Sequence, residues 1–338
     1  MSHDVDRRSF LKGTLRSGGA IAAGLASAGV ATGLGHEERI LLAQLAKEKD
    51  PAKAGTPNKE GAGAAMPQGK IGDLAMSRLI CGGNLIGGWA HSRDLIYSSR
   101  LFKAYNTDEK IMETLQLCEE HGVNAILTNP VSGGVINRYW RERGGKIQWI
   151  CEAHPKPEDF KTDIRENLDR GAALMYIQGG EADRLFKNGQ LDLIAKTVAF
   201  IKENGVPAGV GAHALEVVAA CEEKGVNPDF YVKTLHSNDY WSAKRDDQTQ
   251  DVISNGADNY WCLEPEKTIE FMKTVAKPWV AFKVMAAGAI HPKKGFRHAF
   301  ENGADFVCAG MFDFQVAEDA AMAVEILADL KRDRPWQA

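Results

Sequence analysis

Side chains that can bind or move a proton recur near the ends of short apolar segments in this sequence. Glu152 and His154 follow QWIC, Gln178 ends LMYIQ, His213 ends GVGAH, and Lys283 lies within WVAFKVM. Histidine titrates near neutral pH, a carboxylate can orient it, and an ammonium group stabilises negative charge that develops on oxygen. We predict that these five residues form a catalytic site, in which His154 transfers a proton, Glu152 orients it and Lys283 stabilises the oxygen anion.

The apolar segments that carry these residues alternate with amphipathic segments of helical spacing. Pro278–Phe312 shows the pattern clearly, with a buried strand, a turn at Gly288, a helix over Lys293–Asn302 and a second buried strand. About eight such alternations fill residues 69–335, which predicts a single (β/α)8 barrel of the TIM type. An open doubly wound sheet is less favoured, because no strand is followed by the GxGxxG spacing.

Strand alternation predicts where the polar side chains point. Glu152 and His154 are two residues apart, so they share one face of their strand, and a polar pair of this kind fits the barrel interior. In a barrel the carboxyl ends of all strands meet at one rim. On the predicted sixth strand, Lys233 and His236 have opposite parity, so one of them lies beyond the regular strand.

Three kinds of chemistry are compatible with this rim. The first is a divalent metal held by His154, His213 and His236 together with Glu152, because neutral imidazoles and a carboxylate suit zinc or a similar ion. Only convergence at strand ends supports this set, since the sequence contains no local metal-ligand spacing. Each histidine alone is also typical of a hydrogen-bonded core or rim position.

The second is lysine-dependent lyase or isomerase chemistry, in which Lys233 in DFYVKT and Lys283 in AFKVMAAGAI form a Schiff-base pair. A second ammonium group lowers the pKa of a lysine and leaves it nucleophilic. The two placements resemble those in deoxyribose-phosphate aldolase, although the rest of the chain does not. An inward lysine paired with Glu152 or Asp239 is the alternative.

The third is redox chemistry with a bound nicotinamide, in which His154 or His213 supplies the proton. Gly288 and the basic helix start at Lys293 and Lys294 are candidates for contact with a cofactor phosphate such as that of NADP. A solvated helix start explains the two lysines equally well.

Several segments resemble the aldo-keto reductase superfamily over about Gly69 to Leu327. GKIGDLAMSRLICGGN resembles its amino-terminal hairpin and first strand, TDEKIMETLQLCEEHGVNAILT its first helix and second strand, and GVPAGVGAH its fifth strand. FKVMAAGAI and GADFVCAGM resemble its last two strands. The resemblance implies a (β/α)8 barrel and an NADP-linked oxidoreductase that uses Asp, Tyr, Lys and His.

All four of these positions are substituted here, which implies a rebuilt active site. A non-catalytic binding or scaffold barrel is therefore the alternative to an enzyme, although many inward charges without a use would cost stability. The Asp position falls at Leu127, the Tyr position near Ser132 with Tyr139 as a displaced candidate, the Lys position at Glu152 or Ala153, and the His position at Gln178.

The amino-terminal residues 1–35 resemble a twin-arginine export signal. Arg7 and Arg8 stand in DRRSFLK, and an Ala- and Gly-rich run follows over 18–33 that is too short and too weakly apolar for a stable membrane span. We expect export by the twin-arginine translocase to the periplasm or the extracellular space, as a secreted protein. Residues 36–68 are rich in Pro, Gly, Ala and Lys in their second half, which indicates a linker.

Composition limits the possible partners. The net charge is −4 and the isoelectric point is about 6.2, which argues against nucleic acid or an anionic membrane as a partner. The six cysteines have no CxxC spacing and fit small buried thiols. Export and the polar rim together favour a small polar substrate with a carbonyl or hydroxyl group, such as a carbohydrate.

Overall fold

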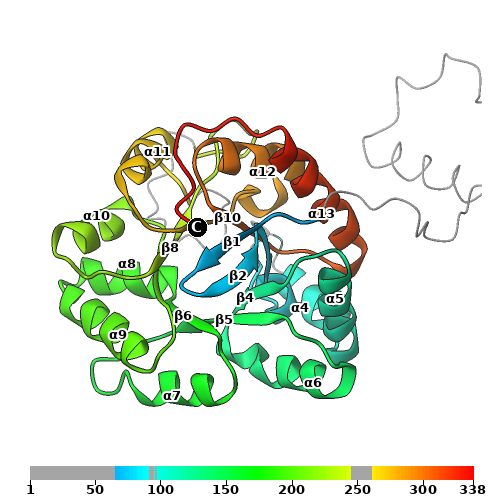
Figure 1. Cartoon of the computed structure of the whole chain (residues 1–338), viewed down its shortest axis with the longest axis horizontal. Helices are drawn as coiled ribbons and strands as arrows, with labels where there is room; N and C mark the ends of the chain where they lie inside the picture. Colours follow the sequence, from blue (N-terminus) through cyan, green and yellow to red (C-terminus); the bar gives the residue numbers. More distant parts are fainter. Residues whose placement is uncertain (1–64, 91–94, 96, 245–260) are drawn as a thin grey trace, which may run out of the picture. The chain divides into compact units, whose positions relative to one another are not determined.

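The computed structural model describes residues 65–90, 95, 97–244 and 261–338. Within the compact unit Gly63–Ala338, eight parallel strands close into a barrel in the order β10-β3-β4-β5-β6-β7-β8-β9 (Figure 1). The predicted (β/α)8 barrel is therefore confirmed. The barrel strands are β3 Leu79–Gly82, β4 Ala125–Thr128, β5 Gln148–Ala153, β6 Leu174–Ile177, β7 Ala208–Ala212, β8 Phe230–Thr234, β9 Trp279–Phe282 and β10 Phe306–Ala309.

Alternation along the strands separates two apolar cores. Ile150 on β5 and Phe230 on β8 point into the barrel, whereas Cys151 and Tyr231 pack against the helices outside it. Both faces are apolar because helices cover the outside and side chains fill the inside, as expected for a parallel barrel. This alternation fixes which polar residues reach the interior.

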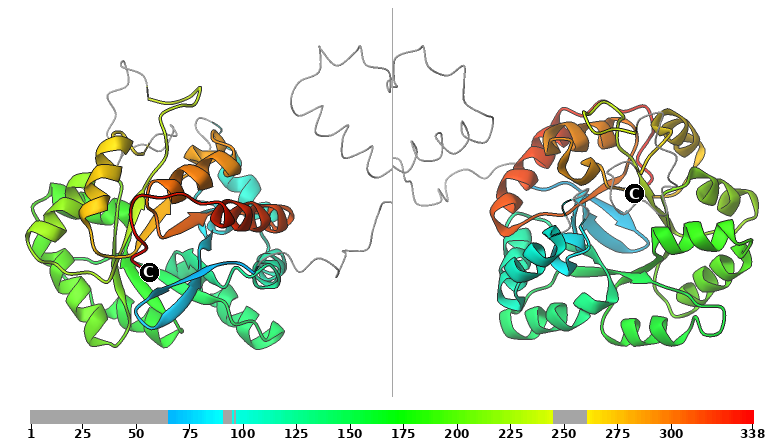
Figure 2. Two further views of the ribbon diagram at one scale, coloured as in Figure 1. Left: turned by 45° about the horizontal axis from the view of Figure 1, so that its top comes forward. Right: turned by 180° about the vertical axis from the view of Figure 1, so that it is seen from behind.

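A two-stranded antiparallel hairpin closes the end of the barrel at which the strands begin (Figures 1 and 2). Its strands are β1 Gln68–Ile71 and β2 Leu74–Ser77. Ile71 and Met76 are fully buried against the interior core, and the Asn124 side chain donates to the Ala75 carbonyl just before β4 begins. This end of the barrel is therefore filled by apolar side chains.

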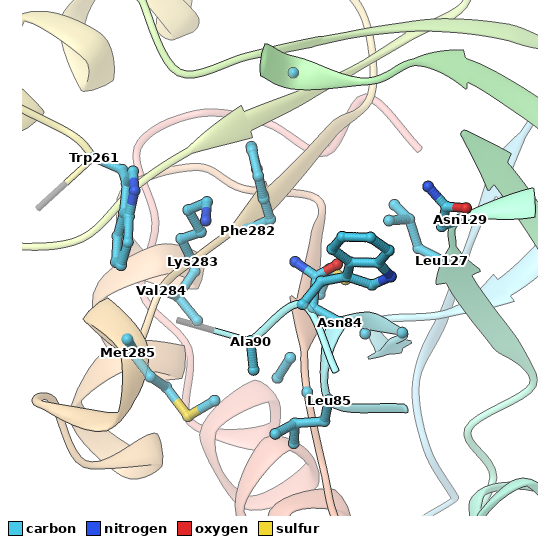
Figure 3. A pocket seen from close by; sticks show the side chains of 18 of the residues that line it. Asn84, Leu85, Ala90, Leu127, Asn129, Trp261, Phe282, Lys283, Val284 and Met285 are labelled. Atoms are coloured by element: carbon cyan, nitrogen blue, oxygen red, sulfur yellow. The ribbon is translucent and has the colours of Figure 1, made fainter. Parts of the chain in front are cut away.

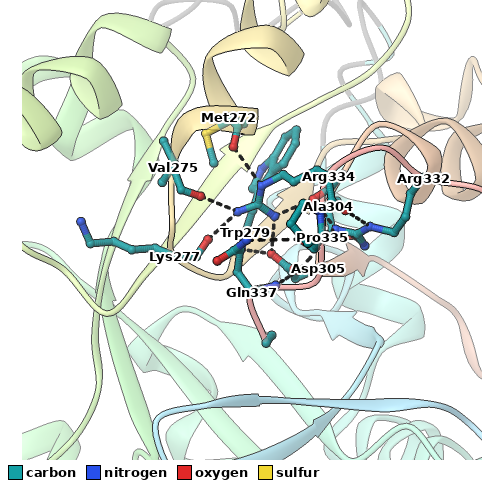
Figure 4. Close-up of polar contacts among 12 residues, drawn as sticks. Met272, Val275, Lys277, Trp279, Ala304, Asp305, Arg332, Arg334, Pro335 and Gln337 are labelled. Atoms are coloured by element: carbon teal, nitrogen blue, oxygen red, sulfur yellow. Dashed lines mark hydrogen bonds and ion pairs between the residues drawn. The ribbon is translucent and has the colours of Figure 1, made fainter.

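A buried arginine network seals the same end (Figure 4). Arg334, which follows the last helix, donates to Asp305 Oδ2 at 2.6 Å, and their side chains are 1% and 0% exposed. The remaining guanidinium hydrogens reach the carbonyls of Met272, Val275 and Lys277, and a further bond reaches that of Gly303. The carboxy-terminal tail is thus part of the folded barrel.

Helices surround the barrel, and three of them, including the short α3 Asn84–Gly87, lie in segments whose sequence does not predict them. α8 begins with Gly179 and Gly180, which disfavour helix, but the Gln178 side chain caps it by accepting from the Glu181 amide at 2.9 Å. α4 lies in the long connection after β3. The helices are α3 Asn84–Gly87, α4 Ser98–Tyr105, α5 Asp108–Glu120, α6 Gly133–Arg143, α7 Thr162–Asp169, α8 Gly179–Lys187, α9 Leu191–Glu203, α10 Leu215–Glu223, α11 Pro265–Thr274, α12 Pro292–Glu301 and α13 Asp313–Ala328, with 3-10 turns η1 Pro130–Ser132 and η3 Ala286–Gly288.

The predicted export signal, residues 1–35, and nearly all of the predicted linker lie outside the described residues. Among the helices that the structure describes, none has the length and apolar character needed to cross a membrane.

Candidate active site

A cavity of about 830 Å³ lies where the barrel strands end. All five residues predicted to be catalytic line it, and they come from four different strand ends, β5, β6, β7 and β9. Their convergence follows from the parallel barrel, which brings the carboxyl ends of its strands to one rim. The polar lining also includes Asn84, Asn129, Tyr176 and Glu181, and its apolar side includes Leu85, Trp89, Phe102, Trp261, Phe282, Met285, Ile290 and Phe312.

Glu152 is the centre of a hydrogen-bonded network inside the cavity. The Tyr176 hydroxyl donates to Glu152 Oε1 at 3.1 Å, and Asn129 Nδ2 donates to Oε2 at 3.1 Å. His154 Nε2 lies 3.3 Å from the same Oε2. A carboxylate that accepts from several donors has a fixed orientation, so Glu152 can in turn hold His154 in place.

Two pKa shifts follow from this network. Burial lowers the pKa of His154, but the hydrogen bond to Glu152 and nearby carboxylates outweigh burial, so the net pKa is raised. Burial and the Glu152 charge raise the pKa of Tyr176 well above its usual value. His154 is therefore an acid near neutral pH, and Tyr176 stays a neutral hydroxyl donor.

His213, which follows β7, is held by Asp183 of α8. Its Nδ1 lies 2.7 Å from Asp183 Oδ2, and the same carboxylate accepts from the backbone amides of His213 and Ala214 at 3.0–3.1 Å. Close packing permits this contact, because a Cβ at Gly211 would lie 2.7 Å from the Ile177 carbonyl. α8 can therefore start directly against β7.

The His213 imidazole is neutral near pH 7. Burial is the largest influence on the pKa of His213 and lowers it, and the charge of Lys283 acts in the same direction. The hydrogen bond that His213 donates to Asp183 opposes the shift but does not cancel it. When Nδ1 carries the proton and donates to Asp183, Nε2 keeps its lone pair. His213 is therefore arranged as a base, in contrast to His154.

Lys283 lies just after β9 and its amine contacts an aromatic face. Nζ is 4.2 Å from the ring centroid of Trp261, and Figure 3 shows the side chain between Trp261 and Phe282. Within the described part of the chain, Nζ makes no hydrogen bond or ion pair. Burial lowers the pKa of Lys283 to about 7, although the Glu152 charge opposes the shift.

The other lysine of the predicted pair faces away from the cavity. Lys233 is 1% exposed on the outer side of β8, and its Nζ donates to Thr234 O at 3.0 Å and Thr234 Oγ1 at 2.8 Å. It shares that face with Tyr231, because residues two apart on a strand point the same way. Lys233 does not form a pair with Lys283 in the cavity.

The three histidines predicted to bind a metal do not meet. His236 is fully buried outside the cavity lining, and its Nε2 accepts from the amides of Trp261 and Cys262 at 2.9 and 3.0 Å. Its Nδ1 lies 3.0 Å from the Ser237 carbonyl, and burial lowers the pKa of His236 to about 4. Both ring nitrogens are used structurally, and the described residues contain no group of three side chains that could hold a metal.

The predicted phosphate contacts are only partly at the cavity. Gly288 lines it with φ 87°, but Lys293 pairs with Glu325 at 3.2 Å, and neither Lys293 nor Lys294 is part of the lining. His291 Nδ1 accepts from the Lys293 amide at 3.2 Å and so occupies the start of α12. Of the three predicted phosphate contacts, Gly288 is therefore the one that lies at the cavity.

The four reductase positions also differ from their family roles. Leu127, Glu152 and Gln178 line the cavity, but Ser132 is buried against Thr128 Oγ1 at 3.1 Å. Tyr139, the displaced candidate, donates to Glu119 within the helix layer. Tyr176 is instead the tyrosine in the cavity, and it shares strand parity with Gln178, a signal that could have identified it.

Neither a protein-family model nor a curated protein sequence matches the chain. Two solved structures from Pseudomonas aeruginosa, each described as a candidate aldo-keto reductase, are similar at 18% identity. One has a TM-score of 0.54 and is matched over 77% of this chain and 94% of its own. The other has a TM-score of 0.52, with 77% and 96% matched. At this identity the likeness shows the fold, and this chain is a (β/α)8 barrel that resembles aldo-keto reductases in structure.

Proposed function

We propose that this protein is an enzyme that acts on a carbonyl or hydroxyl group of a small polar molecule. The observation that carries the proposal is a cavity that holds two histidines whose pKa values are shifted in opposite directions, together with a lysine amine that has no polar partner among the described residues. Pairs of titratable groups whose surroundings shift their pKa values apart are typical of acid–base catalysis. Their position at the strand ends is the usual place for catalysis in this fold.

The arrangement divides the work among three groups. His154, held by Glu152, donates a proton, and His213, held by Asp183, accepts one. Lys283 contacts the carbonyl oxygen or carbon of the substrate, because its amine faces the cavity and no described residue offers it a competing acceptor. Each group has a fixed orientation before the substrate arrives, which lowers the cost of reaching the transition state.

The lining supports a neutral substrate rich in hydroxyl groups. Among the described lining residues, Lys283 is the one basic side chain besides the two histidines, so a phosphate clamp is missing there. Asn84 and Glu181 offer hydrogen bonds to hydroxyl groups, and Trp89 is 54% exposed at the same cavity. An aromatic face beside polar groups suits a sugar ring.

A screen with neutral aldoses, ketoses and short aldehydes tests the proposal, with substrate loss followed by NMR. The wild type should consume at least one compound, and His154→Ala should lose about 10²–10⁴-fold in turnover at an unchanged melting temperature. Lys294→Met, on the exposed part of α12, is the matched control and should keep full turnover. No consumption by the wild type, with higher stability and unchanged ligand binding in His154→Ala, would favour a scaffold barrel.

We also propose that the protein is exported by the twin-arginine route to the periplasm or beyond. The support is the DRRSFLK sequence with Arg7 and Arg8 ahead of an Ala- and Gly-rich run. Replacing both arginines by lysine should leave the protein in the cytoplasm, as followed by cell fractionation. Unchanged export of that variant would contradict the route.

A further inference from the structure

We propose that Lys283 forms a covalent imine with the carbonyl carbon of a neutral, non-phosphorylated aldehyde or ketone in this cavity. The inference rests on the proposed function and states how the substrate is held. Its starting point is geometric: Nζ reaches into the cavity, contacts the Trp261 ring at 4.2 Å and, among the described residues, has no acceptor within hydrogen-bond distance. An amine without such a partner keeps its lone pair available to an electrophile.

The backbone around Lys283 is held in an unusual conformation. Lys283 has φ 57°, and Ala286 and Ala287 follow with φ 46° and 55°, all in the left-handed region. For residues other than glycine this conformation is unfavourable, because it brings Cβ too close to the following carbonyl oxygen. The Ala286 amide donates to the Lys283 carbonyl at 2.9 Å and holds the turn. Strain of this kind gathers at functional sites, and here it fixes the departure of the lysine from β9.

Trp261 is a rigid wall against which the amine is placed. It is 2% exposed, its amide donates to His236 Nε2 at 2.9 Å, and its carbonyl accepts from Thr234 Oγ1 at 3.2 Å. The structural role of His236 is therefore to position this tryptophan. An aromatic face held on one side of Nζ leaves the open cavity as the direction from which a substrate can approach.

The titration of the amine agrees with this geometry. Burial lowers the pKa of Lys283 to about 7, so roughly half of the side chains are neutral and nucleophilic at neutral pH. Lys233 is a comparison within the same barrel, because burial lowers its pKa too. Its Nζ is bound to Thr234 and faces the helices, so it has no access to a substrate.

The reaction balances without an oxidant or reductant. The Nζ lone pair forms a bond to the carbonyl carbon, the carbonyl oxygen takes a proton, and nitrogen loses one, which gives a carbinolamine. Proton donation to its hydroxyl releases water while the second nitrogen proton leaves and the C=N bond forms. His154 is arranged to donate to the departing oxygen and His213 to accept from nitrogen, so amine and carbonyl become imine and water.

The charge of the lining limits the carbonyl compound. Glu152 and Glu181 add negative charge to the cavity, and the described lining contains no arginine. A phosphate group would meet these carboxylates with no arginine among the described lining residues to clamp it, and it would therefore be disfavoured relative to a neutral ligand. The expected ligand is therefore a neutral hydroxyaldehyde or hydroxyketone.

The test is reductive trapping of the full chain at pH 7 with cyanoborohydride and either glycolaldehyde or dihydroxyacetone. Peptide mass spectrometry should place the first adduct on Lys283 at a rate about 10²–10³ times that of surface lysines, because a neutral amine is far more abundant there. Lys283→Met and Lys283→Arg should lose this adduct, and Lys294→Met should keep it. Glyceraldehyde 3-phosphate at equal concentration should label Lys283 at least about tenfold more slowly.

The outcomes separate this inference from the proposed function. If Lys283 is labelled no faster than surface lysines, the inference is wrong. If turnover survives in Lys283→Arg, the inference is also wrong, but the proposed function stands. A Lys283 adduct in a protein that turns over none of the screened compounds supports the covalent site and overturns the proposed function. Lys283→Arg keeps a cation at this position but cannot form the imine. The inference can therefore be tested with Lys283→Arg even if Lys283→Met does not fold.

Discussion

Each end of the barrel holds a cationic side chain, and the two side chains have very different partners. At the end where the strands begin, Arg334 donates to Asp305 and to a group of backbone carbonyls, so its charge is fully compensated (Figure 4). At the end where they finish, Lys283 meets an aromatic ring and no described acceptor (Figure 3). The end where the strands begin is therefore built for stability, whereas the end where they finish keeps its polar groups available for a ligand.

The largest change in stability is expected at the end of the barrel where the strands begin. Arg334→Ala leaves the buried Asp305 carboxylate short of its main partner and should lower the free energy of unfolding by about 3–5 kcal/mol in urea denaturation. Turnover per folded molecule should stay unchanged, because the network lies at the opposite end from the cavity. A loss below about 1 kcal/mol would mean that Arg332, 3.5 Å from Asp305, suffices to compensate it.

A change in stability of the opposite sign is expected at the end where the strands finish. Lys283→Met removes a partly buried amine that has no polar partner in the described part of the chain, so it should raise the free energy of unfolding by about 1–3 kcal/mol at pH 7, while turnover is lost. The folded pKa of about 7 lies below the ordinary 10.5, so the cost of the lysine is full below pH 7 and vanishes as pH rises toward 10.5. The gain of the variant in urea denaturation should shrink over the same range. Equal stability of both proteins at pH 6 and pH 10 would contradict this account.

A smaller effect is expected from Glu152→Gln, which keeps the shape of the network but removes its charge. Because Glu152 raises the pKa of His154, the variant should lower that pKa and move the alkaline limb of the pH–rate profile, where the proton donor is lost, to lower pH. Turnover at pH 7 should fall by about tenfold, less than removal of the acid itself costs. NMR titration of the His154 ring measures the shift, and an unchanged titration would exclude Glu152 as its cause.

The smallest effect is expected from Lys294→Met on α12. This lysine is exposed and lies outside the cavity lining, so stability should change by less than about 0.5 kcal/mol and turnover not at all. A clear loss of turnover would show that the start of α12 contacts the substrate or a cofactor.

Hydrophobic periodicity was sufficient to predict the barrel, because each strand carries a continuous apolar run and helices separate the runs. For example, the apolar segment QWIC lies in β5, and GVGAH runs from β7 to His213. α8 was not predictable from periodicity, since its paired glycines resemble a loop and its capping by Gln178 depends on local hydrogen bonds. The site depends on α8, because this helix carries Asp183, which holds His213.

Strand parity placed the polar side chains correctly in the cavity but could not assign their partners. Glu152 and His154 share an inward face and do meet, as their spacing of two predicts. The Asp183 contact with His213 joins residues thirty positions apart, and such pairs depend on packing rather than on pattern. The predictions for His236 and Lys233 were wrong, because the sequence does not show whether a polar residue near the end of β8 faces the cavity or the helices.

The most direct test of the difference between the two ends is the pKa of Lys283 in the folded protein. Competitive acetylation across pH, with peptide mass spectrometry of each lysine, reports the pH at which each amine becomes half reactive. We expect about pH 7 for Lys283, while exposed Lys294 should continue to rise in reactivity beyond pH 10. If Lys283 follows the same curve as Lys294, its amine is an ordinary solvated cation, and the cavity is not tuned as we describe.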